Sequence, residues 1–560
     1  VQLDSQRQWF RYHHLFQELL KAQLQRTHSR AAIATLHQRA ASWLARHNQV
    51  TAAVQHALCA DDLPLAAAIL EAAVRPEMMR GDTQQAQDWL TRFPNNALDQ
   101  YPHLLLDWCL LEMMRVQTKL IEWVARTDAA LAVAQLTAEE RQRAQAELTM
   151  FTIIARFYRR EFDTVRQLVQ DNDHSLADAE PLVQGMLAYV QMHLEWYEGQ
   201  FDYALTFGSQ AIEALRDAGF DHIVISVRID RARISAQRGY PREALAMLQE
   251  LVAAAPANGS FVIQELALAQ VNAMNLHYWM NDIEAAQREQ QSALALARRL
   301  ADPDTIGEIA SLDALFDMAR VTGKSSEIEA SWPQGTVSTI LQLNKLHFHQ
   351  LVRQGQLERA WHFATTFGVR LENEITAENL FYFIMLLEVT IARGSELESV
   401  MPRFAEAFAQ AENVGSRLFV AELHALSAWA HLQLEQRQEA EEALRQALDL
   451  AVDTGYVRFI IDIPALAPLL AVLDHPDAAE MWVATVSDAQ RRQAAQLTDR
   501  ERLVLVHLTR PVRYQDIADD LGISIGTVRT HISRVYAKLG VNKRNDAVAR
   551  ARALGLTAMS

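Results

Sequence analysis

The sequence predicts an all-α protein, with stacked helical hairpins followed by a small four-helix domain. The 560 residues include only 19 Gly and 14 Pro, a composition more typical of helical than of β-rich chains. An Ala-rich helical unit recurs between residues 60 and 460. Residues 497–560 divide into four short segments with apolar residues at helical spacing.

The recurring unit begins with a polar or Gly-containing turn and continues as an Ala-rich helix. The small residues that mark it are Ala204, Ala244, Ala285, Ala360 and Ala440. Their spacings of 40, 41, 75 and 80 residues correspond to one or two units of about forty, and a weaker unit places Val165 39 residues before the first. Because one hairpin cannot bury its apolar face alone, the units are expected to stack into a superhelix. The pattern resembles tetratricopeptide-like repeats of greater length.

Five aromatic residues of the repeat region leave two interpretations open. They are Trp196, Tyr197, Trp279, Trp361 and Trp429. Aromatic side chains at helical spacing usually pack in a core. The alternative is that they line a concave groove for a ligand.

The first two helices of residues 497–560 have recognisable ends. Thr498 and Glu501 form a capping box, in which the hydroxyl accepts from a free backbone amide and the carboxylate reaches back. A second helix is predicted over about 514–521. Gly522 ends it, as expected of a residue that adopts positive φ without strain.

The third helix, capped by Ser524, has one apolar and one polar face, and with the second helix it forms a helix-turn-helix. The residues expected to face the core are Val528, Ile532, Val535 and Leu539. The opposite face has no bulky apolar residue. Arg can bond guanine through two hydrogen bonds, and Thr can bond a base or contact a thymine methyl group. The residues expected to read bases are Arg529, Thr530, Ser533 and Arg534.

A second set of residues is placed to hold DNA phosphates, which position a domain without reading sequence. They are Tyr514, Gln515, Thr527, Lys538, Lys543 and Arg544. Residues 491–560 hold 13 Lys and Arg against 6 Asp and Glu, whereas the other 490 residues hold 40 against 63. A basic region on an acidic body indicates that only this region contacts nucleic acid.

The motifs at fixed spacing are Leu497-Thr498, Arg500-Glu501, Val504-Leu505, Ile517-Ala518, Leu521, Ile523-Ser524, Thr527-Val528-Arg529, His531 and Lys538-Leu539-Gly540-Val541. They resemble the LuxR-type DNA-binding domain. The chain departs from that pattern at Pro511-Val512-Arg513, where a Gly and small polar residues are usual, and at Asp516, where Glu is usual. The resemblance implies a dimer contact through Ala547, Val548, Ala551 and Leu554. The alternative is that this stripe only covers the small core.

The N-terminal region carries a second resemblance. Residues 10–16 read F-R-Y-H-H-L-F, and further matches are His37, Ala40, Ala41, Trp43, Ala53, His56, Ala57 and Leu58. The string is similar to the segment that follows the ATPase in large MalT-like LuxR regulators. The resemblance implies an N-terminal ATPase, which we expect this chain to lack, a small inducer bound by the repeats, and activation by self-association.

Four parts are therefore predicted. Residues 1–60 form a helical segment of the kind that follows an ATPase module. Residues 61–460 form a helical-repeat, tetratricopeptide-like sensor domain. Two prolines and a polar composition make 461–496 a cap and linker. Residues 497–560 form the LuxR-type helix-turn-helix domain.

No enzyme chemistry and no cofactor are expected. Gly323-Lys324-Ser325 resembles the end of a phosphate-binding loop, but Met318 stands where its first Gly should be and no β-strand precedes it. The adjacent His13 and His14 point apart, and no neighbouring Cys or carboxylate set completes a metal site. No nucleophile with its base and no spaced set of metal ligands is evident, so catalytic and metal-binding residues are predicted to be absent.

The cysteines and the hydropathy bear on location. Cys59 and Cys109 are too few for a disulfide framework and fit a reducing cytosol. No run approaches the roughly 18 apolar residues of a membrane span. A cytoplasmic protein without a membrane partner is therefore expected.

Together these observations predict a sequence-specific DNA-binding transcriptional regulator, an activator, whose repeats sense a small inducer or a partner protein. The expected partners are double-stranded DNA, a second copy of the chain, the inducer and RNA polymerase. The alternative is a tetratricopeptide-like protein-interaction scaffold with secondary DNA binding.

Overall fold

The computed structural model describes residues 14–114, 119–254, 260–300, 348–349, 351–352, 355–366, 368–377, 379–394, 396–482, 484, 497–508, 513–539, 543–544 and 547–548. Within these residues all regular secondary structure is helical, which confirms the predicted fold class. The chain divides into two compact units. One comprises Val1–Leu187, Ala214–His222 and Asn258–Phe261, and the other Ala188–Glu213, Ile223–Ala257 and Val262–Ser560.

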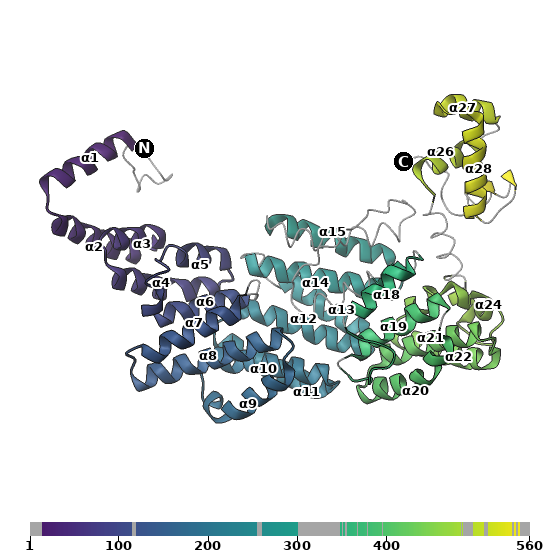
Figure 1. Cartoon of the computed structure of the whole chain (residues 1–560), viewed down its shortest axis with the longest axis horizontal. Coiled ribbons are helices and arrows are strands. Elements are labelled where there is room, and N and C mark those ends of the chain that lie inside the picture. The colour runs from purple at the N-terminus through teal and green to yellow at the C-terminus, as the bar shows by residue number, and fades with distance from the viewer. Residues whose placement is uncertain are drawn as a thin grey trace. The chain divides into compact units, whose positions relative to one another are not determined.

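Figure 1 shows the helices in chain order, coloured from purple at the N-terminus to yellow at the C-terminus. The first are α1 (His14–Thr27), α2 (Arg30–Arg46), α3 (Val50–Cys59), α4 (Leu63–Met79), α5 (Thr83–Leu90), a 3-10 turn (Leu98–Gln100), α6 (Pro102–Met114), α7 (Leu120–Val133), α8 (Ala138–Tyr158), α9 (Phe162–Ala177), α10 (Pro181–Tyr197) and α11 (Phe201–Asp217).

The helices that follow are α12 (Asp221–Gln237), α13 (Pro241–Ala254), α14 (Ser260–Trp279), α15 (Ile283–Leu300), α18 (Leu357–Thr366), α19 (Leu380–Arg393), α20 (Leu397–Asn413), α21 (Arg417–Gln433), α22 (Arg437–Thr454), α23 (Arg458–Ile461), a 3-10 turn (Pro464–Leu466) and α24 (Ala467–Leu470). The last three are α26 (Asp499–Leu508), α27 (Tyr514–Leu521) and α28 (Ile525–Leu539). None of the described helices combines the length and the apolar character that a membrane crossing requires.

Six of the described hairpin turns share one backbone feature. Each contains a residue of positive φ, namely Arg160, Gly199, Gly239, Asn281, Gly355 and Glu435. Five positions later comes a small side chain with no exposed surface: Val165, Ala204, Ala244, Ala286, Ala360 and Ala440. A positive φ reverses the chain sharply, and a small residue lets the paired helices approach. The repeat is confirmed, with one correction: Ala286, not Ala285, is the equivalent residue.

The same register reaches further back along the chain than the predicted repeat. Asn48, Asp61 and Gly81 also have positive φ. The residues five positions later, Ala53, Ala66 and Ala86, are likewise fully buried. Hairpin geometry therefore begins within the first sixty residues.

Gly199 shows how tightly one of these turns packs. Its φ is +77°, and a Cβ atom added there would lie 2.3 Å from the side chain of Val414. Atoms cannot approach so closely without a shift of the chain. This turn therefore requires Gly for its backbone conformation and for space.

A buried ion-pair network joins α4, α6 and α8 in the first unit. The Arg75 guanidinium donates to Asp107 at 2.7 Å and to both oxygens of Glu147, at 3.0 and 2.7 Å. Burial raises the pKa of Asp107 to about 6, although the guanidinium opposes that shift. Two buried carboxylates from neighbouring hairpins are thus held together by one cation placed between them.

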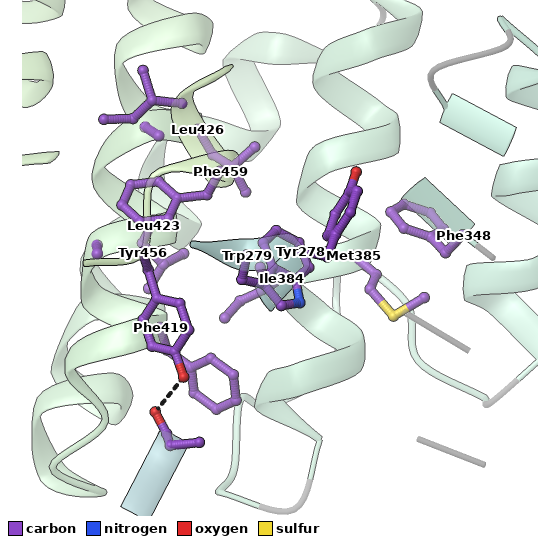
Figure 2. Close-up of a cluster of buried hydrophobic side chains, with 14 of the residues drawn as sticks. Tyr278, Trp279, Phe348, Ile384, Met385, Phe419, Leu423, Leu426, Tyr456 and Phe459 are labelled. Atoms are coloured by element: carbon purple, nitrogen blue, oxygen red, sulfur yellow. Dashed lines mark hydrogen bonds between the residues drawn. The ribbon is translucent and has the colours of Figure 1, made fainter. Parts of the chain in front are cut away.

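Figure 2 shows an aromatic and aliphatic core of the second unit, to which α14, α19, α21 and the segment after α22 contribute. The Tyr456 hydroxyl donates to the Ala236 carbonyl at 2.9 Å, drawn as a dashed line. The Val457 amide donates to the Trp279 carbonyl at 3.0 Å. These bonds fix the segment after α22 against earlier hairpins and so close the last repeat.

The five aromatic residues fall into two groups. Trp279 is buried, so the core interpretation holds for it. Trp196, Tyr197, Trp361 and Trp429 are half-buried. The Trp196 indole donates to Gln237 at 2.8 Å, and the Arg393 guanidinium lies 4.7 Å from the centre of the Trp361 ring. Both are thereby held within the repeat stack.

Candidate nucleic-acid interface

The helices α26, α27 and α28 enclose a small core of their own. Its buried residues are Val504, Leu508, Ile517, Ala518, Val528 and Ile532. Val528 and Ile532 were expected to face this core. Helix α27 has the predicted bounds, and Gly522 ends it with a φ of +64°. The Ser524 hydroxyl then accepts the Thr527 amide at 3.1 Å and caps α28. The predicted helix-turn-helix is confirmed.

The entry of α27 is well formed despite the departures from the family pattern. The Asp516 carboxylate accepts the Arg513 backbone amide at 2.7 Å. An Asp three residues into a helix therefore satisfies a terminal amide as the usual Glu would. Pro511 and Val512 lie outside the described residues.

The capping box of α26 is also part of the domain's interior. The Thr498 amide donates to Glu501 at 2.8 Å, and the Thr498 hydroxyl accepts the Glu501 amide at 3.3 Å. The Glu501 side chain is 2% exposed, and the Lys538 ammonium donates to it at 2.7 Å. Burial by itself raises the pKa of Glu501, but the bonds from Lys538 and Thr498 outweigh it and hold the pKa below its usual value.

The predicted base-reading residues share one face of α28 and are all exposed: Arg529, Thr530, Ser533 and Arg534. Positions i, i+1, i+4 and i+5 lie together on a helix, opposite the buried Val528, Ile532 and Val535. The Thr530 hydroxyl donates to the Gly526 carbonyl at 3.1 Å, so it retains lone pairs for an external donor. Gly526 has no side chain, so nothing at this position would hold the edge of a DNA groove away from α28.

The predicted phosphate-binding residues differ in their surroundings. Lys543 and Gln515 are exposed, and the Gln515 amide donates to Asp519 at 2.9 Å. Tyr514 is half-buried against the small core, and the exposed Thr527 shares a hydrogen bond of 2.8 Å with Ser524. Exposure and charge therefore make Lys543 the strongest phosphate candidate of these four.

Lys538 and Arg544 have structural contacts that the sequence did not reveal. Lys538 pairs with the buried Glu501, and the Arg544 guanidinium donates to the Leu508 carbonyl at 3.2 Å, at the end of α26. Both side chains tie α26 to later parts of the domain. Each side chain therefore already has a role in the fold. A phosphate contact by either one remains a prediction.

The predicted dimer stripe lies partly against the domain itself. Ala547 is fully buried, and Val548 packs against the core of the three helices. These two residues therefore cover the small core, as in the alternative interpretation of the stripe. Ala551 and Leu554 lie outside the described residues, as does Gly323-Lys324-Ser325.

The helix-turn-helix of α27 and α28, with its polar outer face, has the architecture of a DNA-binding domain. Residues 495–551 match bacterial regulatory proteins of the luxR family, and residues 1–32 match the MalT winged helix domain. The chain therefore resembles MalT-like regulators of the LuxR family in both regions.

Two relatives align with nearly the whole chain. The chain is 21% identical over 622 residues to the HTH-type transcriptional regulator MalT of Yersinia pestis (strain Pestoides F), covering 99% of this chain and 65% of that protein. MalT of Yersinia enterocolitica is 21% identical over 627 residues, with the same coverage. This chain thus spans 65% of the length of these relatives. The crystal structure of yeast Tom70 aligns with 81% of this chain at 14% identity and a TM-score of 0.22.

Proposed function

We propose that this chain binds specific double-stranded DNA through α28 and regulates transcription in response to a signal received by its helical repeats. The observation that supports this most is the exposed face of α28. Arg529 and Arg534 stand there five positions apart, with Thr530 and Ser533 between them. A helix with one face in the core and hydrogen-bonding groups on the other can enter the major groove, where base edges carry a unique code.

Each element of the domain has a distinct task in this proposal. The N-terminal half of α28 reads bases through Arg529 and Thr530, and the next turn extends the reading through Ser533 and Arg534. Lys543 contacts the phosphate backbone, which fixes the register of the domain. The excess of Lys and Arg in residues 491–560 supplies a salt-dependent attraction to any DNA.

The remaining parts of the proposal rest on the family. The repeats bind a small inducer or a partner protein, the chain self-associates on DNA, and the outcome is activation through RNA polymerase. Such a regulator acts in the cytoplasm. One short recognition helix reads only a few base pairs, and two helices on half-sites about one turn of DNA apart supply the rest. A tetratricopeptide-like scaffold with secondary DNA binding is the alternative, supported by the stacked hairpins.

The test is selection of binding sites from a random DNA pool with the whole chain. We expect one enriched motif for the parent chain, loss of preference at one base position for Arg529→Ala, and an unchanged motif for Arg437→Ala, an exposed residue of α22. No enriched motif, or an equal effect of both variants, would count against the proposal. A tight protein partner captured without DNA, together with no motif, would favour the scaffold.

A further inference from the structure

Three buried side chains meet inside the second unit, away from the helix-turn-helix. They are His349, Glu388 of α19 and Glu422 of α21, exposed by 5%, 6% and 3%. One ligand-type atom from each lies within 4.8 Å of the others. His349 Nδ1 lies 2.9 Å from a Glu388 oxygen. The three residues come from three successive hairpins, so the stack itself brings them together.

The register of the turns explains this meeting. His349 stands six residues before Gly355, and Glu388 stands six residues before Gly394, both of which have positive φ. Equivalent positions on neighbouring helices face one another in a stacked repeat. At the same register in earlier hairpins, His193 precedes Gly199 and Arg233 precedes Gly239. There the carboxylate of Asp230 accepts from Arg233 at 2.9 Å and lies 3.1 Å from His193.

The chemistry at His349 differs, because Glu388 stands at the register position that Arg233 occupies in the earlier pair. Two carboxylates this close repel each other strongly where water is excluded. The first unit has a comparable pair, Asp107 and Glu147, and the Arg75 guanidinium lies between them. A cation between two such groups removes the repulsion and supplies the bonds that burial takes away.

His349 Nε2 is buried and has no hydrogen-bond partner among the residues that the structure describes. The ring itself is held in place by its neighbours. Its edge contacts with Trp279 and Phe348, whose ring centres lie 5.1 and 5.8 Å away, fix its orientation.

We propose that His349, Glu388 and Glu422 bind one divalent transition-metal ion such as Zn²⁺, which ties three hairpins of the repeat stack together. Imidazole and carboxylate ligands suit Zn²⁺, and three protein ligands leave a fourth position for water. With bonds of about 2.0–2.2 Å to the metal, ligand atoms of a tetrahedral site lie about 3.3–3.6 Å apart. The separations within this cluster do not exceed 4.8 Å, and that between His349 Nδ1 and the Glu388 oxygen is 2.9 Å. The ion takes the place of the proton on Nδ1, and the neutral ring then carries its proton on Nε2.

The experiment uses the whole chain, stripped of metal by chelator and titrated with Zn²⁺ alone. We expect one equivalent to bind by calorimetry and elemental analysis, and the melting temperature to rise with metal concentration, because binding to the folded state stabilises it. His349→Gln, Glu388→Gln and Glu422→Gln should each weaken binding at least about tenfold. His193→Gln, at the same register beside Arg233, is the matched control and should bind as the parent does.

Co²⁺ in place of Zn²⁺ gives a readout that does not depend on the stability of any variant. Visible d–d bands should grow to saturation at one equivalent in the parent chain, and their energies should report nitrogen and oxygen ligands. Substoichiometric binding by the parent, or equal loss of binding in His193→Gln and Glu388→Gln, would overturn the proposal.

Discussion

The Lys538 ammonium lies 2.7 Å from a carboxylate oxygen of Glu501, and the Glu501 side chain is 2% exposed. This pair joins the C-terminal half of α28 to the first turn of α26. This charge-assisted hydrogen bond helps to orient α28, whose exposed face carries Arg529 and Thr530.

Replacement of Lys538 by Met should destabilise the helix-turn-helix by about 1–3 kcal/mol, because a buried carboxylate loses its partner. Urea denaturation followed through the domain's helical signal measures the effect. Lys543→Met removes the same charge from an exposed position and should change stability by less than about 0.5 kcal/mol. Equal stability of the two variants would show that the pair contributes nothing.

The same pair makes stability depend on pH in the acid range. The pKa of Glu501 is lower in the folded domain than its unfolded value of about 4.3. The stabilisation is therefore complete above that unfolded value and is lost as the pH falls through the folded-state pKa. We expect the stability difference between the parent and Glu501→Gln to be constant from pH 6 to 5 and to shrink below about pH 4. A difference that does not change with pH would contradict this assignment.

The sequence predicts local features better than contacts between distant segments. The bounds of α27, the Gly522 turn and the Ser524 cap follow from residues a few positions apart, and all are confirmed. Lys538 and Glu501 stand 37 positions apart, so nothing local indicates that they meet. The positive charge of Lys538 suits a DNA phosphate as well as it suits a carboxylate. Only the folded domain shows that its partner is Glu501.

The His349–Glu388–Glu422 cluster was missed for a related reason. The spacing of its members follows the hairpin repeat rather than any metal-binding motif. Alignment of the repeats on their turns would have placed His349 and Glu388 at one register. That alignment needs the positive-φ residue of each turn, and this residue is Gly in some turns but Arg, Asn or Glu in others. The same variation explains why the sequence pattern indicates Ala285, and not Ala286, as the small residue that marks this repeat.

Gly199 and Gly455 provide a matched pair for the packing of the repeats. Both have a positive φ, of +77° and +80°, but only at Gly199 does an added Cβ meet another side chain, that of Val414. Gly455→Ala should cost about 1–2 kcal/mol for the left-handed backbone alone. Gly199→Ala carries the same backbone cost and an added clash, so it should lower the melting temperature further. If the two variants melt together, the turn can move away from Val414 without penalty.

Arg529 and Lys543 form a matched pair for testing base reading against phosphate binding. Both are exposed and positively charged, but Arg529 lies on the outer face of α28, whereas Lys543 follows its end. Arg529→Ala should cost about 1–3 kcal/mol on the selected site and relax preference at one base position. Lys543→Ala should weaken binding to all sequences alike and reduce the slope of log K against log salt by about one. Titrations on specific and scrambled duplexes at several salt concentrations distinguish the two effects. Even loss across both duplexes for Arg529→Ala would remove this residue from the reading surface and leave only its charge.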